Sequence, residues 1–281
     1  MDRIAVIAGN GDLPENISLS LHGQARLAGI IGVNRELDWA GSMPHVSLGF
    51  GQLGKLWSQL RRWETTAVIF AGGVAERPSY RTFKLDFGTI ASLPKVVAAL
   101  VGGDDNVLRA VADIFAGQGF PVVGLSDVVP SLLAEEGQLG LVRIERDQFA
   151  DLEEAFSQAK ALGAMDAGQA AIVERGRSIA LEAAEGTDAM LQRVVALRRE
   201  GRISSRGGGV LVKCAKPRQD LRFDLPTIGM NTLRLASEAK LSVIGVEAGR
   251  SIILDQKRLI ETANVGQIAL YGFAGSRDRH G

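Results

Sequence analysis

A charged segment, Lys213–Thr227, carries the residue types that phosphate chemistry requires, and it follows directly after an apolar run. Its charged residues are Lys213, Lys216, Arg218, Asp220, Arg222 and Asp224. Lysine and arginine bind phosphate oxygens, while a carboxylate can orient a water molecule or hold a cation. The alternation in residues 220–224 predicts an extended segment with its charged side chains on one face. A solvated surface loop is the competing interpretation, because runs of charge commonly have that origin.

Two further polar motifs follow apolar runs in the C-terminal half. Thr187 and Asp188 stand where a strand-like run gives way to a helical pattern. Asp188 is either the N-cap of that helix or, together with Thr187, a ligand for phosphate and its magnesium ion. Glu247 and Arg250 add a carboxylate and a guanidinium at the end of another strand. Both motifs are candidates for the ligand-binding edge of a sheet.

Two glycine turns mark the N-terminal half. Residues 8–12 read A-G-N-G-D and lie between a strand and a helix, where glycines let backbone amides approach an anion. The motif resembles a dinucleotide fingerprint only partly, because Pro14 replaces the third glycine and no acidic residue follows the second strand. Gly72 and Gly73 end another central strand, so both turns are predicted to line one crevice. Alternatively, the glycines serve the chain topology alone.

The composition excludes several classes of function. The 281 residues contain 32 basic and 32 acidic side chains, which argues against a nucleic-acid partner. Only three histidines occur and they are scattered, so zinc, Ser-His-Asp and calcineurin-type chemistry lack parts. A metal site would therefore use oxygen ligands, which suits magnesium. The single cysteine, the short N-terminal apolar run and the absence of a membrane-length segment predict a soluble cytoplasmic protein.

Hydrophobic periodicity predicts two domains of different type. In residues 1–132, strands alternate with helices, as in a Rossmann-like parallel sheet. The predicted strands are residues 3–8, 27–33, 46–50, 67–71 and 122–125, and the predicted helices are a segment starting near Pro14 and residues 52–64, 90–101 and 106–118. Residues 133–148 are predicted to be a linker.

A mixed α/β domain is predicted for residues 149–274, followed by a mobile tail at 275–281. Two apolar runs, 170–174 and 178–183, are joined by Arg175-Gly176 and predict an antiparallel hairpin. Further strands are predicted at 210–214, 243–246 and 268–271, with helices at 149–162, 189–199, 256–263 and from Thr227 onward.

Taken together, the motifs resemble a known enzyme family. The chain is similar to the LpxI type of UDP-2,3-diacylglucosamine pyrophosphatase from about residue 3 to residue 272. The matching stretches are I-A-G-N-G-D-L-P (7–14), F-A-G (70–72), M-D-A-G-Q (165–169), E-G-T-D-A-M-L (185–191), K-P (216–217), D-L-P-T-I-G (224–229) and E-A-G-R (247–250).

This resemblance implies a role in lipid A assembly in a Gram-negative bacterium. It implies magnesium-dependent hydrolysis of UDP-2,3-diacylglucosamine to 2,3-diacylglucosamine 1-phosphate and UMP, with water attacking the β-phosphorus. It further implies two domains with the nucleotide-sugar lipid held between them. The required aspartate of the family falls on Asp224. The acyl chains imply transient contact with the inner membrane, and a homo-oligomer is compatible with the sequence.

The residues can be given roles in such a reaction. Asp224 and Asp188 are predicted to be catalytic and to hold magnesium or orient water. The predicted substrate-binding residues are Gly11, Asp12, Gly72, Gly73, Gln169, Thr187, Lys213, Lys216, Arg218, Thr227 and Glu247. Two alternatives stay open, namely a sugar-nucleotide transferase that uses the same phosphate clamp and a non-catalytic nucleotide- or lipid-binding protein.

Overall fold

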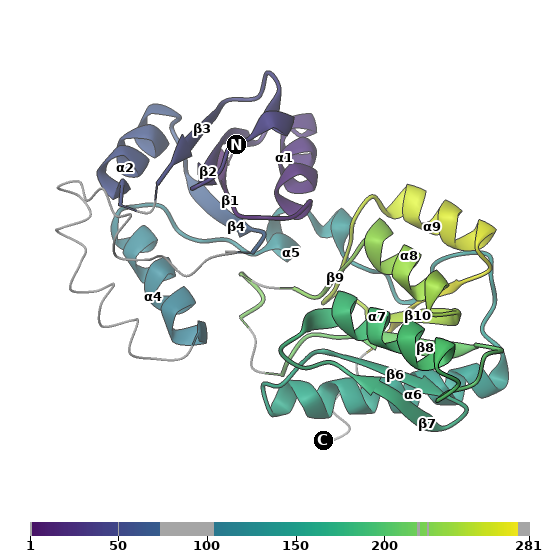
Figure 1. Cartoon of the computed structure of the whole chain (residues 1–281). Coiled ribbons are helices and arrows are strands. Elements are labelled where there is room, and N and C mark those ends of the chain that lie inside the picture. Colours follow the sequence, from purple (N-terminus) through teal and green to yellow (C-terminus); the bar gives the residue numbers. More distant parts are fainter. Residues whose placement is uncertain (1, 50, 74–103, 218–219, 224, 275–281) are drawn as a thin grey trace, which may run out of the picture. The chain divides into compact units, whose positions relative to one another are not determined.

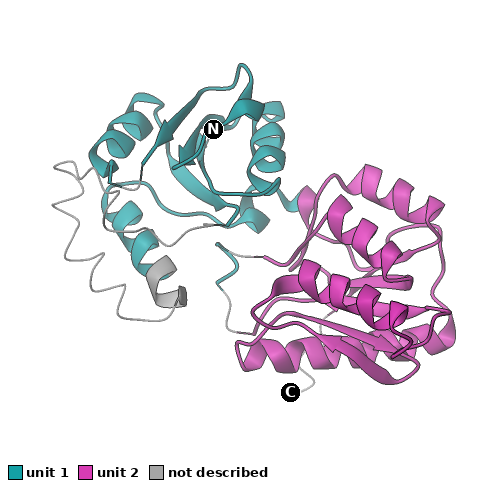
Figure 2. Cartoon of the chain, viewed as in Figure 1, with its two compact units in different colours: residues 1–130, 220–224 teal, residues 131–219, 225–281 magenta. Residues whose placement is uncertain are grey.

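The computed structural model describes residues 2–49, 51–73, 104–217, 220–223 and 225–274. The chain forms two compact units (Figure 2), and the division is not a single cut. Unit 1 comprises residues 1–130 together with 220–224, and unit 2 comprises residues 131–219 together with 225–281. The predicted helix at 90–101 lies outside the described residues.

Unit 1 is built on a parallel sheet of four strands in the order β3-β2-β1-β4 (Figure 1). The strands are β1 (Ile4–Ala8), β2 (Leu27–Val33), β3 (His45–Leu48) and β4 (Ala67–Ala71). Strand β1 is buried along its whole length, which explains why its sequence is continuously apolar rather than alternating. The N-terminal parallel-sheet prediction is therefore confirmed.

Helices α1 (Leu13–Gly23), α2 (Leu53–Arg62) and α4 (Asp104–Gly117) complete this unit. The apolar stripe of α2 buries Leu56, Trp57 and Leu60. Trp57 packs edge-on against Phe115 of α4, with the ring centroids 4.7 Å apart. The core of unit 1 is thus largely aromatic on the side of α2 and α4.

The predicted strand at 122–125 is not formed. Val122 makes an isolated bridge to Val68 of β4, and Val123 N donates a hydrogen bond to Val68 O. Gly124 then serves as the N-cap of a short helix, α5 (Leu125–Val128). Glycine and the following Ser-Asp pair favour a turn and a helix start over an extended strand, so the apolar run ends early.

Unit 2 contains a mixed sheet of six strands in the order β5-β12-β10-β8-β6-β7. The strands are β5 (Gly137–Gln138), β6 (Ala170–Glu174), β7 (Arg177–Leu181), β8 (Gly209–Lys213), β10 (Leu241–Glu247) and β12 (Ala269–Phe273). Strands β8, β10 and β12 are parallel, whereas β6 and β7 form the predicted antiparallel hairpin. The mixed α/β prediction is therefore confirmed.

Helices cover both faces of this sheet (Figure 1). Ala171 and Val173 of β6 pack with α6 (Arg146–Ala164) on one face. Ala170 and Ile172 face α7 (Gly186–Arg199), α8 (Met230–Glu238) and α9 (Gln256–Val265) on the other. This alternation along a fully buried strand is the period-2 pattern of a sheet covered on both sides.

Two segments of unit 2 differ in detail from the sequence prediction. Residues 133–148 include β5, which pairs antiparallel with β12, and Ala134 N donates to Ser251 O. The helix predicted from Thr227 begins only at Met230, because Thr227–Ile228 form strand β9, which pairs with β11 (Ile252–Ile253). Gly229, with extended backbone, separates strand from helix. In the described part of the chain, no helix is long and apolar enough to cross a membrane.

Candidate active site

Several predicted site residues meet at one edge of the unit 2 sheet. Strands β8 and β10 are parallel neighbours, and β8 ends at Lys213 beside Val246 of β10. Strand β6 runs the opposite way, so its start lies at the same edge, where Cys214 N donates to Gln169 O at 3.0 Å. The carboxyl ends of parallel strands are where open α/β sheets bind ligands. The topology thus gathers Gln169, Lys213, Lys216 and Glu247 here.

Glu247 lies at the centre of this edge, and only 2% of its surface is exposed. Its Oε2 accepts hydrogen bonds from Ala215 N at 2.9 Å and from Lys160 Nζ at 2.7 Å. Its Oε1 accepts a second contact from Lys160 Nζ at 2.8 Å, and Arg250 Nη1 lies 3.5 Å away. A carboxylate with this many internal partners fixes the chain after β8 rather than offering an open ligand contact.

A second buried carboxylate, Glu182, organises the neighbouring part of the edge. Its Oε1 accepts a hydrogen bond from Thr187 Oγ1 at 2.9 Å, and its Oε2 accepts one from Gln169 N at 2.9 Å. Glu182 therefore ties two predicted substrate-binding residues together. Thr187 Oγ1 keeps its lone pairs for accepting another donor, although its own proton is directed at Glu182.

Three buried polar atoms of this region have no hydrogen-bond partner in the described structure. They are Gln169 Oε1, Arg250 Nε and Ser251 Oγ. Leaving such a group unpaired costs about 1–3 kcal/mol, so native proteins seldom do it without a reason. A polar ligand or ordered water at this edge would satisfy these atoms.

Asp188 lies at the start of α7, but not at its cap. The N-cap is Glu185, and Asp188 falls in the first helical turn with an exposed side chain. Its Oδ2 accepts a hydrogen bond from Asn231 Nδ2 of α8 at 2.7 Å. The bond joins the first turns of two helices, whose free backbone amides favour anions. The capping interpretation of Asp188 is therefore wrong, and its carboxylate remains accessible.

The predicted phosphate-binding residues after β8 contact other residues of unit 2. Lys213 Nζ donates to Thr227 O at 3.1 Å, and Thr227 Oγ1 donates to Leu225 O at 3.0 Å. Lys216 Nζ contacts Asp166 Oδ1 at 2.6 Å in an ion pair whose carboxylate is 86% exposed. Exposed pairs of this kind typically contribute less than about 1 kcal/mol.

Two predicted residues, Arg218 and Asp224, lie outside the described residues. Residues 220–223, which the alternation predicted to be extended, form a turn within unit 1. Phe223 N donates to Asp220 O at 3.1 Å, and Arg222 N donates to Asp220 Oδ1 at 3.1 Å. The Arg222 guanidinium, bonded to the Asp220 carboxylate, holds the pKa of that carboxyl below its usual range. Aspartate bonds its own backbone two residues on, which favours a turn over an extended segment.

The two glycine turns of unit 1 lie side by side, and their role in lining a ligand crevice stays a prediction. Gly9 N donates to Ala71 O, and Asn10 N donates to Gly73 O, both at 2.7 Å. A Cβ atom on Gly9 would lie 2.6 Å from Gly73 O, and Gly72 has a φ of +82°, so both glycines are required by the packing of the turns.

The other predicted residues of these turns have freer surroundings. A Cβ atom on Gly11 or Gly73 would meet no described atom within 4 Å. Asp12 caps α1 without a side-chain bond to the helix and is exposed. Arg35, which sequence reasoning missed, donates from Nη1 to Gly9 O. The open side of these turns thus offers Gly11, Gly73 and Asp12.

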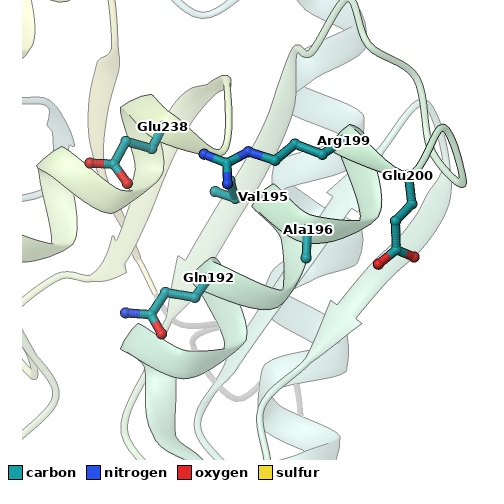
Figure 3. Close-up of a pocket in the computed structure, with 6 residues that line it drawn as sticks. All are labelled: Gln192, Val195, Ala196, Arg199, Glu200 and Glu238. Carbon is teal, nitrogen blue, oxygen red and sulfur yellow. The ribbon is translucent and has the colours of Figure 1, made fainter.

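Neither a hollow on the surface nor the single thiol adds to this site. A hollow of about 320 Å³ lies on α7 and α8 (Figure 3), and the residues that line it are Gln192, Val195, Ala196, Arg199, Glu200 and Glu238. None of these was predicted as a site residue. Burial raises the pKa of the Cys214 thiol to about 12, so it stays protonated and is not a nucleophile at neutral pH.

Comparison with known proteins gives matches that together cover nearly the whole chain. Residues 3–132 match the LpxI N-terminal domain, and residues 135–271 match the LpxI C-terminal domain. The chain is 36% identical over 267 residues to UDP-2,3-diacylglucosamine pyrophosphatase LpxI of Caulobacter vibrioides, with 94% of this chain and 95% of that relative covered. The resemblance inferred from the motifs is confirmed: the chain belongs to the LpxI family.

Proposed function

We propose that this protein is a hydrolase that cleaves the pyrophosphate bond of UDP-2,3-diacylglucosamine in lipid A biosynthesis. The products are 2,3-diacylglucosamine 1-phosphate and UMP. The observation that carries the proposal is the identity of 36% to a named pyrophosphatase across nearly the whole of both chains. The polar edge of the unit 2 sheet supports it, because this edge supplies the charge and the hydrogen-bond donors that a diphosphate requires.

In this proposal, the edge of unit 2 binds and orients the diphosphate. Lys213 and Lys216 neutralise phosphate oxygens, and Arg218 is assigned the same task. The first turns of α7 and α8 add backbone amides beside Thr187. Glu247 and Glu182 act through other groups: they hold the backbone after β8 and the hydroxyl of Thr187 in place. Such fixed donors stabilise developing charge without reorganising during the reaction.

A magnesium ion fits the donor set of this site. No group of three potential metal-ligating side chains occurs among the described residues, so a protein-only cage is not what these residues offer. Asp188, however, is exposed and offers an accessible carboxylate at a helix start. Magnesium is commonly held by one or two carboxylates together with substrate phosphates and water. We assign Asp188 and Asp224 as its ligands.

When bound, the ion would supply positive charge to the diphosphate and lower the cost of developing charge on the leaving group. Asp224 is assigned the orientation of the attacking water and acceptance of its proton. Attack on the β-phosphorus breaks its bond to the bridging oxygen, which leaves with UMP. The new oxygen then resides in the phosphate of the lipid product.

One experiment tests both the reaction and the position of attack. The purified protein is incubated with UDP-2,3-diacylglucosamine and magnesium in water enriched in ¹⁸O, and both products are analysed by mass spectrometry. We expect UMP without label and lipid phosphate with one labelled oxygen. Release of UDP would instead indicate a transferase, and survival of the substrate would indicate a binding protein. Label in UMP would overturn attack at the β-phosphorus.

The same proposal places the protein in the cytoplasm, in transient contact with the inner membrane. Its substrate carries two acyl chains, which favour a membrane surface over bulk water. Sedimentation with vesicles that contain the substrate lipid, at low and moderate salt, measures this association. Equal recovery in the supernatant with and without such vesicles would count against membrane contact.

A further inference from the structure

The segment immediately before Asp224 belongs to unit 1, although the chain on both sides of it belongs to unit 2. The chain leaves unit 2 after Gln219, contributes residues 220–224 to unit 1, and returns to unit 2 at Leu225. This detour falls between β8, a strand of the six-stranded sheet, and β9, which pairs with β11 in a separate two-stranded sheet. The detour therefore invites a functional explanation.

Phe223 is the residue that attaches this segment to unit 1. It is half-buried and packs against the hydrophobic core of that unit. Its ring centroid lies 5.5 Å from that of Phe70, the next-to-last residue of β4, at an interplanar angle of 50°. Phe70 in turn contacts Phe115 of α4, with centroids 5.1 Å apart, and Phe115 contacts Trp57. Phe223 thus ends a continuous row of aromatic rings.

The rest of the segment is shaped to present Phe223 to that row. Asp220 Oδ2 accepts a hydrogen bond from Arg222 Nη2 at 2.7 Å, and Asp220 O accepts one from Phe223 N at 3.1 Å. The Arg222 guanidinium lies 5.5 Å from the Phe223 ring centroid, within the range of a cation–π contact. These contacts connect the Phe223 ring to the turn formed by Asp220 and Arg222.

Helix α4 provides charges that complement this turn. Arg109 contributes to lowering the pKa of Asp220, after the larger effect of the Arg222 hydrogen bond. Asp113 contributes to raising the pKa of Arg222, after the larger effect of Asp220. The ring contact with Phe70 of β4 places the segment on unit 1, and the opposite charges on α4 favour the same position.

We propose that Phe223 is a positioning residue for the reaction, and that unit 1 serves to fix the chain from which Asp224 extends. The proposal rests on the function proposed above, in which Asp224 orients the attacking water. Phe223 directly precedes Asp224 in the sequence, so we expect a loosened Phe223 to disturb the step assigned to Asp224. A displacement of about 1 Å at a reacting group can reduce turnover about 100-fold.

The test compares variants of the aromatic row with a matched aromatic control. Phe223→Ala should lower kcat by about 10- to 100-fold, in line with the cost of misplacing a reacting group. KM should stay within about threefold, because the diphosphate-binding residues are untouched, and Phe223→Tyr should restore most of kcat. The control is Phe149→Ala, which removes a half-buried ring paired with Tyr271 in unit 2 and should leave kcat near that of the unaltered protein.

A double variant tests whether Phe70 and Phe223 act together. Phe70→Leu removes the other ring of the same contact. The double variant Phe70→Leu/Phe223→Leu should have a kcat only slightly lower than that of the more impaired single variant. Interacting residues give such non-additive effects, whereas independent residues give multiplied losses. Multiplied losses, or a kcat for Phe223→Ala equal to that of the unaltered protein, would overturn the proposal.

Hydrogen exchange separates failure of this proposal from failure of the proposed function. The amide of Phe223 is bonded to Asp220 O, and Phe70→Leu should accelerate its exchange by about tenfold. Faster exchange in a protein that releases no UMP would refute the function while retaining the anchor. Unchanged exchange and full activity in Phe70→Leu would refute the anchor alone.

Discussion

In both sheets, predicted ligand-binding residues lie at the carboxyl ends of parallel strands. The two edges differ in that one is formed by backbone groups and the other by side chains. In unit 1, backbone groups of the two turns bond to one another, and Gly9 and Gly72 are required for that close approach. In unit 2, the edge is lined by side chains, with Glu182 and Glu247 buried beneath lysine, arginine and threonine. A glycine-rich strand end therefore does not by itself mark a phosphate site. Charged side chains that are held in place by buried carboxylates are the stronger indication of a phosphate site.

The largest predicted effect concerns the aspartate that is assigned to the attacking water. Asp224→Asn should reduce kcat by about 10²- to 10⁴-fold, the range that a general base contributes. Because asparagine has nearly the same shape as aspartate, we expect the free energy of unfolding to change by less than about 0.5 kcal/mol. Steady-state release of UMP measures the first quantity and urea denaturation the second. Near-normal turnover would remove Asp224 from the mechanism.

The next effect concerns Glu247, the buried carboxylate at the edge of the unit 2 sheet. Glu247→Gln leaves Lys160 beside a neutral amide, and it should lower the free energy of unfolding by about 2–3 kcal/mol. That is less than the 3–5 kcal/mol typical of fully buried pairs, since Lys160 is 24% exposed. Activity should fall as well, because Ala215 N loses an ionised acceptor.

A matched control for Glu247→Gln is Arg234→Gln, which breaks the exposed pair with Glu238 on α8. It should change the free energy of unfolding by under about 0.5 kcal/mol. Equal effects of the two substitutions in urea denaturation would show that the buried carboxylate gives no special support.

A smaller effect is expected at the backbone edge of unit 1. Gly72→Ala places a Cβ against Asn10 O at a φ of +82°, and should destabilise the protein by about 1–3 kcal/mol. Gly11→Ala has the φ penalty alone, because nothing lies within 4 Å of its Cβ position, and should cost about 1 kcal/mol. Thermal unfolding compares the two variants. A larger loss for Gly11→Ala would contradict the packing role of Gly72.

A pH dependence is also expected, from Cys214. Its pKa is raised from 9.0 to about 12 by burial, so the folded protein retains the thiol proton at a pH where the unfolded chain releases it. The contribution to stability is therefore complete below pH 9 and declines as pH rises from there toward 12. Urea denaturation between pH 8 and 10.5 measures the slope, and Cys214→Ala should reduce it. An identical slope in that variant would assign it to other groups.

Much of the fold could be predicted from the sequence because its central strands are uninterrupted apolar runs. Strands β2 and β4 begin and end at the predicted residues. The errors fall where short polar or glycine-containing sequences decide the outcome. Gly124 ends one apolar run early, and Thr227–Ile228 pair with a strand that is distant in the sequence.

The supporting residues of the site could not be predicted in the same way. Lys160 lies 87 residues from its partner Glu247, and it sits in an ordinary helical pattern on α6. Such a pair is visible only when the strand order brings α6 over β8 and β10. The turn at Asp220 could have been predicted from the local sequence. Aspartate side chains accept hydrogen bonds from the backbone amide two residues on, as Asp220 does from Arg222 N.

The insertion of residues 220–224 into unit 1 has a consequence for how the protein can be divided and inherited. A gene cut after residue 130 would give one fragment without the ring that covers Phe70, and another with Phe223 left exposed. An exchange of N-terminal halves between relatives would combine a Phe70 and a Phe223 that had not diverged together. We therefore expect Phe70 and Phe223 to vary together among relatives, and a natural chimera to keep residues 220–223 from the same parent as its first half.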